Sequence, residues 1–93
     1  MAEQAVIHHY NAGFLQPNEY DVPFGTRIRS AAFNRAFPVV YVEKIVIPEG
    51  GPQRKLHVVY YATGQEFDID GSMVFIGTVQ NGPFFWHVYG KIV

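Results

Sequence analysis

The side chains best suited to bind a charged ligand are three arginines. Arg27 and Arg29 stand two positions apart in the alternating segment Thr26 to Phe33, so an extended backbone puts them on one face, and Arg35 follows just past its end. Guanidinium groups this close suit a phosphate or a carboxylate, because each presents a planar fork of donors. The alternative is that the arginines pair with the acidic run Glu66 to Asp70 within the fold.

Aromatic residues and a histidine are concentrated near the C-terminus, where the chain reads FFWHVY. In a strand this segment divides into two faces: Phe84, Trp86 and Val88 on one, and Phe85, His87 and Tyr89 on the other. We predict that the first face lies in the core and that the second serves an interface or a ligand pocket. The reverse assignment stays open, because both faces are apolar and a shift of one residue in register exchanges them.

The histidines do not favour a metal site. His8 and His9 are adjacent and should point to opposite faces of an extended segment, so at most one of them can join His57 or His87. No H-x-H or helical H-x-x-x-H pair is present. We expect partly buried or surface histidines that are hydrogen-bonded to neighbours, and neither a metal nor a cofactor.

The acidic and hydroxyl side chains give little support to catalysis. Glu66, Asp68 and Asp70 alternate as if to hold a hard cation, but the later ligands of a calcium loop are absent, so a solvated acidic connection is expected. Ser30 and Ser72 are the only serines, and neither lies in a G-x-S-x-G setting. The prediction is a protein that is not an enzyme.

The elements that carry these residues are predicted to be strands. β-Branched and aromatic residues dominate the apolar runs, and no window keeps a helical apolar spacing free of Pro and Gly. The expected strands are Ala5 to Tyr10, Glu19 to Val22, Thr26 to Phe33, Phe37 to Ile47, Lys55 to Thr63, Met73 to Gln80 and Phe84 to Tyr89. This spacing predicts an all-β fold, an antiparallel meander that forms a small sandwich or a partly open barrel. The strands on either side of the loop Pro48 to Pro52 are expected to form a hairpin.

The turn before the last strand is predicted to be wider than its residues suggest. Asn81-Gly82 is typical of a tight hairpin turn, but Pro83 has no N–H with which to close it. The loop is therefore expected to be longer, or Pro83 to lie on an unpaired edge.

Size and composition predict a single domain, residues 1–93, that associates with another copy of the chain or with a partner. There is no cysteine to support its thin core, and the formal charge of -1 removes the general attraction to nucleic acid. No apolar segment is long enough to cross a membrane, so a cytoplasmic location is expected. Hydrophobic residues make up 48% of the chain and charged residues 16%, so another copy of the chain or a partner is expected to cover apolar surface.

Two C-terminal motifs resemble a group of short phage and prophage proteins of unassigned function. The motifs are FIGTVQ at Phe75 to Gln80 and WHVY at Trp86 to Tyr89, which are similar to an aromatic-I-G-T-[VF]-Q strand, a glycine-containing turn and a W-H-V-aromatic strand. A looser likeness extends to Tyr20-Asp21-Val22-Pro23 with Gly25, and to Thr63-Gly64. The resemblance implies a phage origin and carries over no catalytic residue.

The expected function follows from these features together. Small phage proteins that are not enzymes frequently inhibit a host system, by binding a host protein or by sequestering a nucleotide signal. We predict a homo-oligomer in the host cytoplasm that captures a nucleotide-derived anion between subunits, with Arg27 and Arg29 on phosphate and Trp86 or Tyr89 stacking on the base. The alternatives are an inhibitor that docks a host defence protein on an exposed aromatic face, and a minor component of the virion.

Overall fold

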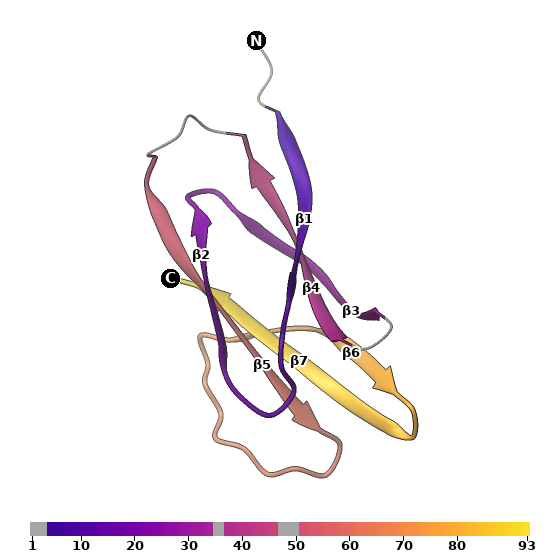
Figure 1. Ribbon diagram of the computed structural model, residues 1–93. Coiled ribbons are helices and arrows are strands. Elements are labelled where there is room, and N and C mark those ends of the chain that lie inside the picture. The colour runs from indigo at the N-terminus through magenta and orange to yellow at the C-terminus, as the bar shows by residue number, and fades with distance from the viewer. Residues whose placement is uncertain (1–3, 35–36, 47–50) are drawn as a thin grey trace.

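The computed structural model describes residues 4–34, 37–46 and 51–93, which form two antiparallel sheets (Figure 1). The strands are β1 (Ala5–Asn11), β2 (Asn18–Pro23), β3 (Arg27–Asn34), β4 (Phe37–Ile45), β5 (Gln53–Ala62), β6 (Val74–Asn81) and β7 (Phe84–Ile92). One sheet has the order β1-β4-β3 and the other the order β2-β5-β7-β6. The predicted all-β antiparallel sandwich is confirmed. Within these described ranges, no helix is long and apolar enough to cross a membrane.

The core lies between the two sheets and consists mainly of valines. Its buried side chains are Val22, Val40, Val42, Leu56, Val58, Tyr60, Val79 and Val88. β4 contributes from one sheet, and β2, β5, β6 and β7 contribute from the other, as expected for two aligned sheets that share one apolar layer. Burial of these side chains away from water is the main force that holds the sheets together.

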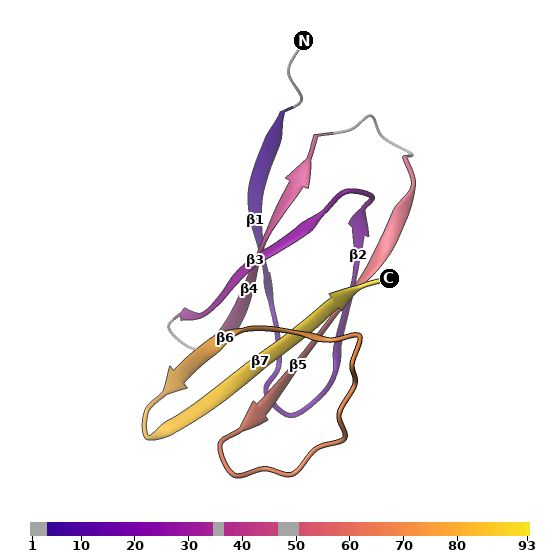
Figure 2. The ribbon, with the colours of Figure 1, turned by 180° about the vertical axis from the view of Figure 1, so that it is seen from behind.

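The expected hairpin between the fourth and fifth strands is wrong. β4 lies between β1 and β3, whereas β5 lies between β2 and β7 in the other sheet (Figure 2). Both strands present an inward apolar row, Val40 with Val42 and Leu56 with Val58. A hairpin would place both rows side by side on one sheet, whereas in the sandwich they lie on opposite walls of one core. Ile47 and the first part of the predicted loop, residues 48–50, lie outside the described residues.

The two faces of β7 lie as predicted over most of its length. Trp86 and Val88 point into the sandwich, where Trp86 stacks on Phe14 with ring centroids 4.6 Å apart. Phe84, which was expected beside them in the core, is instead 60% exposed. It is the first residue of the strand after the turn, opposite Asn81, so it lies at the open end of the sandwich.

Gly90 on β7 lies where neighbouring strands leave no room for a side chain. A Cβ atom built at Gly90 would lie 2.7 Å from Cδ1 of Ile76 and 3.2 Å from Cδ1 of Ile28. The missing side chain therefore makes room for two isoleucines, one on β6 and one on β3. These two strands lie against each other where the edges of the two sheets meet.

The turn between β6 and β7 is tight, contrary to the prediction. Asn81 pairs directly with Phe84, so only Gly82 and Pro83 form the loop. The two turn residues are thus one position later in the sequence than the Asn81-Gly82 pair suggests. Gly82 has a φ of 60°, which suits the first central position of a type II′ turn, and Pro83 fits the second with its φ near −65°. The proline is outside the ladder, so its missing N–H leaves no pairing incomplete.

β3 does not keep the alternation predicted for it. Its register against β4 shifts between Ile28 and Ser30, which identifies a β-bulge at Arg29. Ala31 consequently packs against the core together with Ile28, whereas strict alternation would put it on the side of Arg27 and Arg29. Arg27 and Arg29 still share the outer side, where both lie near Glu43 of β4.

Truncation of the indole tests the assignment of Trp86 to the core. Trp86→Ala is expected to lower the free energy of unfolding by about 3–5 kcal/mol, because the cavity left beside Phe14 cannot close completely. Phe84→Ala is the matched control on the same strand and face, and it should cost less than about 1 kcal/mol because Phe84 is mostly exposed. Urea unfolding followed by far-UV circular dichroism measures both. Equal losses from the two variants would contradict the assignment.

Candidate functional site

Aromatic side chains gather on the outer side of the four-stranded sheet. Residues of β5 and β7 alternate between the core and this outer side. Tyr60 and Val88 are buried in the core, so their neighbours Tyr61 and Tyr89 lie on the outer side. We call the group the aromatic face; it consists of Tyr61, Phe67, Phe75, Phe85 and Tyr89. Two of the residues predicted for a ligand site, Phe85 and Tyr89, belong to it.

Four of these rings contact one another. Tyr61 and Phe67 stack with centroids 3.9 Å apart and an interplanar angle of 10°. Tyr89 meets both of them at a tilt, with centroids 5.9 Å from Tyr61 and 5.8 Å from Phe67. Phe75 approaches Tyr89 edge-on at 5.5 Å. Tilted and edge-to-face contacts of this kind stabilise an aromatic cluster beyond the burial of its area.

Phe67 reaches the cluster from the connection between β5 and β6, which was predicted to be a solvated acidic segment. The connection is irregular and mostly exposed, as expected, yet its Phe67 ring lies flat on Tyr61 of the sheet. The signal was present in the alternation E-F-D-I-D, where Phe67 and Ile69 occupy the positions between the carboxylates. The carboxylates of Glu66 and Asp68 are exposed, and the contact with the sheet comes from the apolar residue between them.

Lys91 fastens this connection to the sheet. Its Nζ donates to Oδ2 of Asp70 and to Oγ of Ser72, both at 3.1 Å. Ser72 in turn donates from its hydroxyl and its backbone N–H to Oδ1 of Asp70. These contacts, led by the Ser72 hydroxyl and followed by the Ser72 N–H and Lys91, lower the pKa of Asp70 to about 2. The carboxylate therefore stays charged, and the connection stays tied, well into acid.

A cavity of about 370 Å³ lies between the connection and the sheet. It is lined by the rings of Tyr61, Phe67 and Tyr89, by the apolar side chains of Ile69 and Met73, and by Asp68 and Asp70. The size suits a small ligand or one large side chain of a partner. Its charged groups are carboxylates, so the cavity favours an apolar or cationic group over an anion.

His87 is held by hydroxyl groups on both sides. Its Nε2 lies 2.8 Å from Oγ1 of Thr63, and its Nδ1 lies 3.2 Å from Oγ1 of Thr78. Thr63 also donates to the backbone oxygen of Phe85, so its hydroxyl oxygen is left to accept from the imidazole. His87 thus joins β7 to β6 and to the start of the connection, and it has no free ring nitrogen to offer a ligand in this arrangement.

The predicted arginines lie on the outer side of the other sheet. Arg29 Nη1 approaches Glu43 Oε1 at 3.8 Å, and Arg27 stands opposite Glu43 in the strand register. Their acidic neighbour is therefore Glu43 and not the run from Glu66 to Asp70, which was the alternative. Arg35 lies outside the described residues. Arg29 reaches the margin of the aromatic face, where it borders a hollow with Phe75, and Arg27 does not line that hollow.

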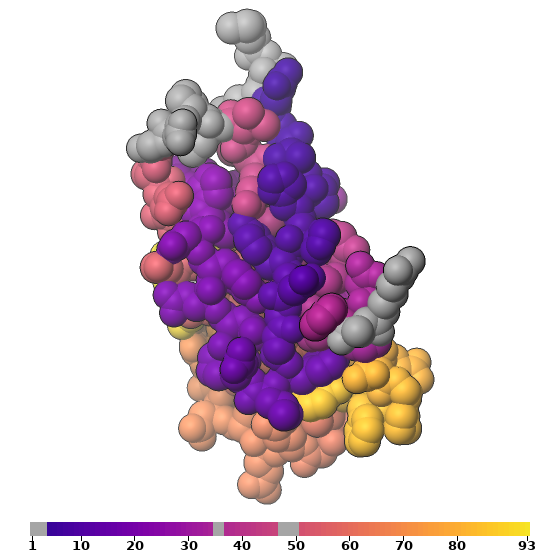
Figure 3. Space-filling view, viewed as in Figure 1, coloured from indigo at the N-terminus to yellow at the C-terminus, as the bar shows by residue number. Residues whose placement is uncertain are grey.

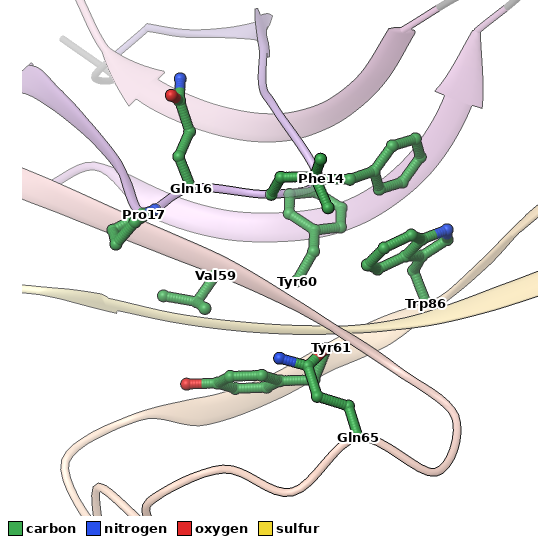
Figure 4. Close-up of a pocket in the computed structure, with 9 residues that line it drawn as sticks. Phe14, Gln16, Pro17, Val59, Tyr60, Tyr61, Gln65 and Trp86 are labelled. Atoms are coloured by element: carbon green, nitrogen blue, oxygen red, sulfur yellow. The ribbon is translucent and has the colours of Figure 1, made fainter.

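A second hollow, of about 330 Å³, opens where the turn before β2 meets the end of β5 (Figure 4). Phe14 covers Trp86 and meets Tyr60 edge-on at 5.4 Å. The hydroxyl of Tyr60 and the Nε1 of Trp86 are buried, and neither has a hydrogen-bond partner among the described residues. Burial, and then the nearby Tyr20, raises the pKa of Tyr60 far above its usual range, so its hydroxyl is neutral and cannot act as a base.

The four histidines are spread over the molecule. His9 is on the outer side of β1, where it meets the ring of Tyr41 on β4 at 5.9 Å, whereas His87 is on the aromatic side of the other sheet. Across the described part of the chain, no group of three or more histidine and carboxylate side chains is placed to hold a metal ion.

The pKa of Asp70 depends on the contacts that tie the connection down. Ser72→Ala removes the leading hydrogen bond and is expected to raise the pKa of Asp70 from about 2 toward its ordinary value. Lys91→Met should raise it as well, because it removes both the hydrogen bond and the positive charge of the lysine. A carbon-13 NMR titration of the Asp70 carboxyl measures both shifts. An unchanged pKa in Ser72→Ala would show that the serine hydroxyl is not a cause of the low value.

Comparison with known proteins identifies a family without a described activity. No curated protein and no solved structure gives a significant match. A family model described as a domain of unknown function, DUF7352, matches residues 3–93. Because that match covers nearly the whole sequence, the chain belongs to the DUF7352 family.

Proposed function

We propose that this protein is a non-enzymatic binding protein that docks a partner protein on its aromatic face. The observation that carries the proposal is the exposure of three phenylalanines on one side of one sheet: Phe67 is 42%, Phe75 56% and Phe85 47% exposed. Apolar side chains gathered on one surface mark interaction sites, and aromatic residues are enriched at the centres of protein interfaces. The outer side of a sheet that served only to face water would be polar.

The charges around the aromatic face indicate the chemistry of the partner. Glu66 and Asp68 are exposed on the connection, and no described residue pairs with either carboxylate. Lys91 is engaged by Asp70 and Ser72. The rim is therefore acidic, and it favours a partner whose apolar contact residues are flanked by lysine or arginine.

The state of the titratable groups supports binding over catalysis. His87 has a hydroxyl at each ring nitrogen, and Asp70 is held by Ser72 and Lys91. His87 joins neighbouring strands and Asp70 ties the connection to the sheet, so both groups have structural roles that are compatible with binding on the aromatic face. The resemblance to phage proteins favours a host protein in the cytoplasm, such as a defence component, as the partner.

Capture of a nucleotide-derived anion between copies of the chain is the second candidate. Arg29 borders a hollow of about 270 Å³ together with Phe75, at the seam where β3 meets β6. Phe75 in turn contacts Tyr89. A guanidinium beside an aromatic ring suits a phosphate and a base, and a second copy would be needed to bring Arg27 to the same ligand.

Two neighbouring phenylalanines provide a matched test of the aromatic face. Phe85→Lys adds a charge to the outer side, and Phe84→Lys makes the same change at an exposed position on the opposite face. The wild-type protein and both variants are used to capture partners from host lysate, and the captured protein is purified and titrated by calorimetry. We expect Phe85→Lys to weaken binding at least about tenfold and Phe84→Lys to leave it unchanged.

Equal affinities for the three proteins would refute docking on this face. Capture of a structural protein of the phage particle, with the same dependence on Phe85, would favour the role of a minor virion component.

The nucleotide candidate is tested by thermal shift with a panel of cyclic and linear nucleotides. A nucleotide at 100 times its Kd should stabilise the protein by about 2.7 kcal/mol, which raises the unfolding midpoint. Arg29→Gln should abolish the shift. Arg54→Gln should preserve it, because Arg54 lies against Phe24 and does not line the hollow. A panel that leaves the midpoint unmoved excludes this candidate.

A further inference from the structure

The free edge of β1 has unpaired backbone groups at known positions. Val46 N donates to Gln4 O at 2.8 Å and Ala12 N donates to Pro38 O at 2.9 Å, and the register with β4 has no shift between them. In an antiparallel pair, hydrogen-bonded positions alternate with positions whose N–H and C=O point away. The even-numbered residues of β1 therefore face β4, and the odd-numbered ones turn outward.

Three of the outward positions, Ala5, Ile7 and His9, have no backbone partner among the described residues. The fourth, Asn11, is different because its carbonyl oxygen accepts from the hydroxyl of Tyr20 at 2.6 Å. The open part of the edge is thus the stretch centred on Ile7. The atoms of β1, in indigo, lie at the surface of the molecule on this side (Figure 3).

β1 lacks the features that normally protect an edge strand. Its seven residues, AVIHHYN, contain no proline and no lysine, arginine or carboxylate, and Ile7 is 53% exposed. β2, the edge strand of the other sheet, carries Glu19, Asp21 and Pro23. The other two edge strands, β3 and β6, lie against each other, and the pairing of each with its neighbour has a register shift. Charges, prolines, bulges and covering elements are the usual means of preventing edge pairing, and the described part of the chain provides none of them for β1.

We propose that a second copy of the chain pairs with this edge, β1 against β1 in antiparallel orientation, with a twofold axis at Ile7. Ala5 then lies opposite His9 of the second copy and Ile7 opposite its own counterpart, so all three outward positions exchange hydrogen bonds. This pairing is independent of the proposed function, because it uses a different strand of the other sheet.

Self-pairing fits this edge better than the addition of a foreign strand. The twofold register sets Ile7 beside Ile7 and Val6 beside His8, so no charged side chains oppose each other in the new ladder. The contact is isologous and closes on itself. The two three-stranded sheets join through their β1 strands, which leaves β3 at each end, where β6 already lies alongside.

The mass in solution tests the pairing. At micromolar concentration, light scattering should give about twice the chain mass of 10.5 kDa. Ile7→Lys places two like charges opposite each other, and Ile7→Pro removes an outward N–H, a change that an edge strand tolerates. Both variants should be monomers with intact far-UV circular dichroism. Ile69→Lys, the same substitution at an isoleucine that is 91% exposed on the connection, should remain a dimer.

Introduced thiols test the register, because the chain has no cysteine of its own. Opposed residues in a hydrogen-bonded antiparallel pair have Cα atoms about 5.5 Å apart, within the range of a disulfide. Ile7→Cys should therefore cross-link to itself on oxidation. The two His9 positions are separated by about 13 Å along the strands, so His9→Cys alone should not cross-link, whereas a mixture with Ala5→Cys should.

Three results would overturn the proposal. A wild-type monomer excludes the pairing, a dimer that survives both Ile7 variants places the interface elsewhere, and self-cross-linking of His9→Cys excludes a twofold axis at Ile7. Phe85→Lys serves as the control for the aromatic face. It should leave the mass of the dimer unchanged, so failure of partner docking and failure of self-pairing remain distinguishable.

Discussion

The structure depends on one thin layer of valine side chains held between two sheets. β4 supplies one wall of this layer, and β5 and β7 supply most of the other. A chain of this length buries a modest fraction of its surface, so the layer covers Tyr60 but cannot cover most of the other large aromatic residues. They accumulate at its margins and on its outer sides. Phe14 and Trp86 close one end of the sandwich, and Tyr61, Phe67 and Tyr89 cluster outside it.

Strand positions were readable from the sequence because they depend on local alternation. The final strand is the clearest case, since Trp86 and Val88 do face the core. The pairing of β4 with β5 could not be read in this way. Adjacency along the chain suggested a hairpin of β4 and β5. The sheet that an apolar strand joins depends instead on the opposite layer of side chains against which the strand is buried. A bulge at Arg29 and a turn displaced by one residue at Gly82 are further local choices that alternation does not encode.

The candidate site was predicted in part for the same reason. Phe85, His87 and Tyr89 follow one another on a strand, so their common face followed from spacing alone. Arg27 and Arg29 lie on the other sheet, with Arg29 at the seam beside Phe75, and no pattern within β3 or β7 states which sheet each strand joins. Phe67 was missed because its role comes from the folding of an irregular connection onto Tyr61. The surface that results is aromatic with an acidic rim, a composition suited to recognition of a protein.

The strand order also has a consequence for the route by which the chain folds. β6 and β7 are joined by a two-residue turn and can pair as soon as both exist, whereas Asn18 must find Val58 and Ala5 must find Ile45. Such distant pairings close large loops and make folding slow compared with that of helical proteins of similar size. During synthesis from the N-terminus, β1 and β2 leave the ribosome before their partners β4 and β5 are made. The uncharged segment from Ala5 to Tyr10 is therefore the part of the nascent chain most exposed to mispairing before the sandwich closes.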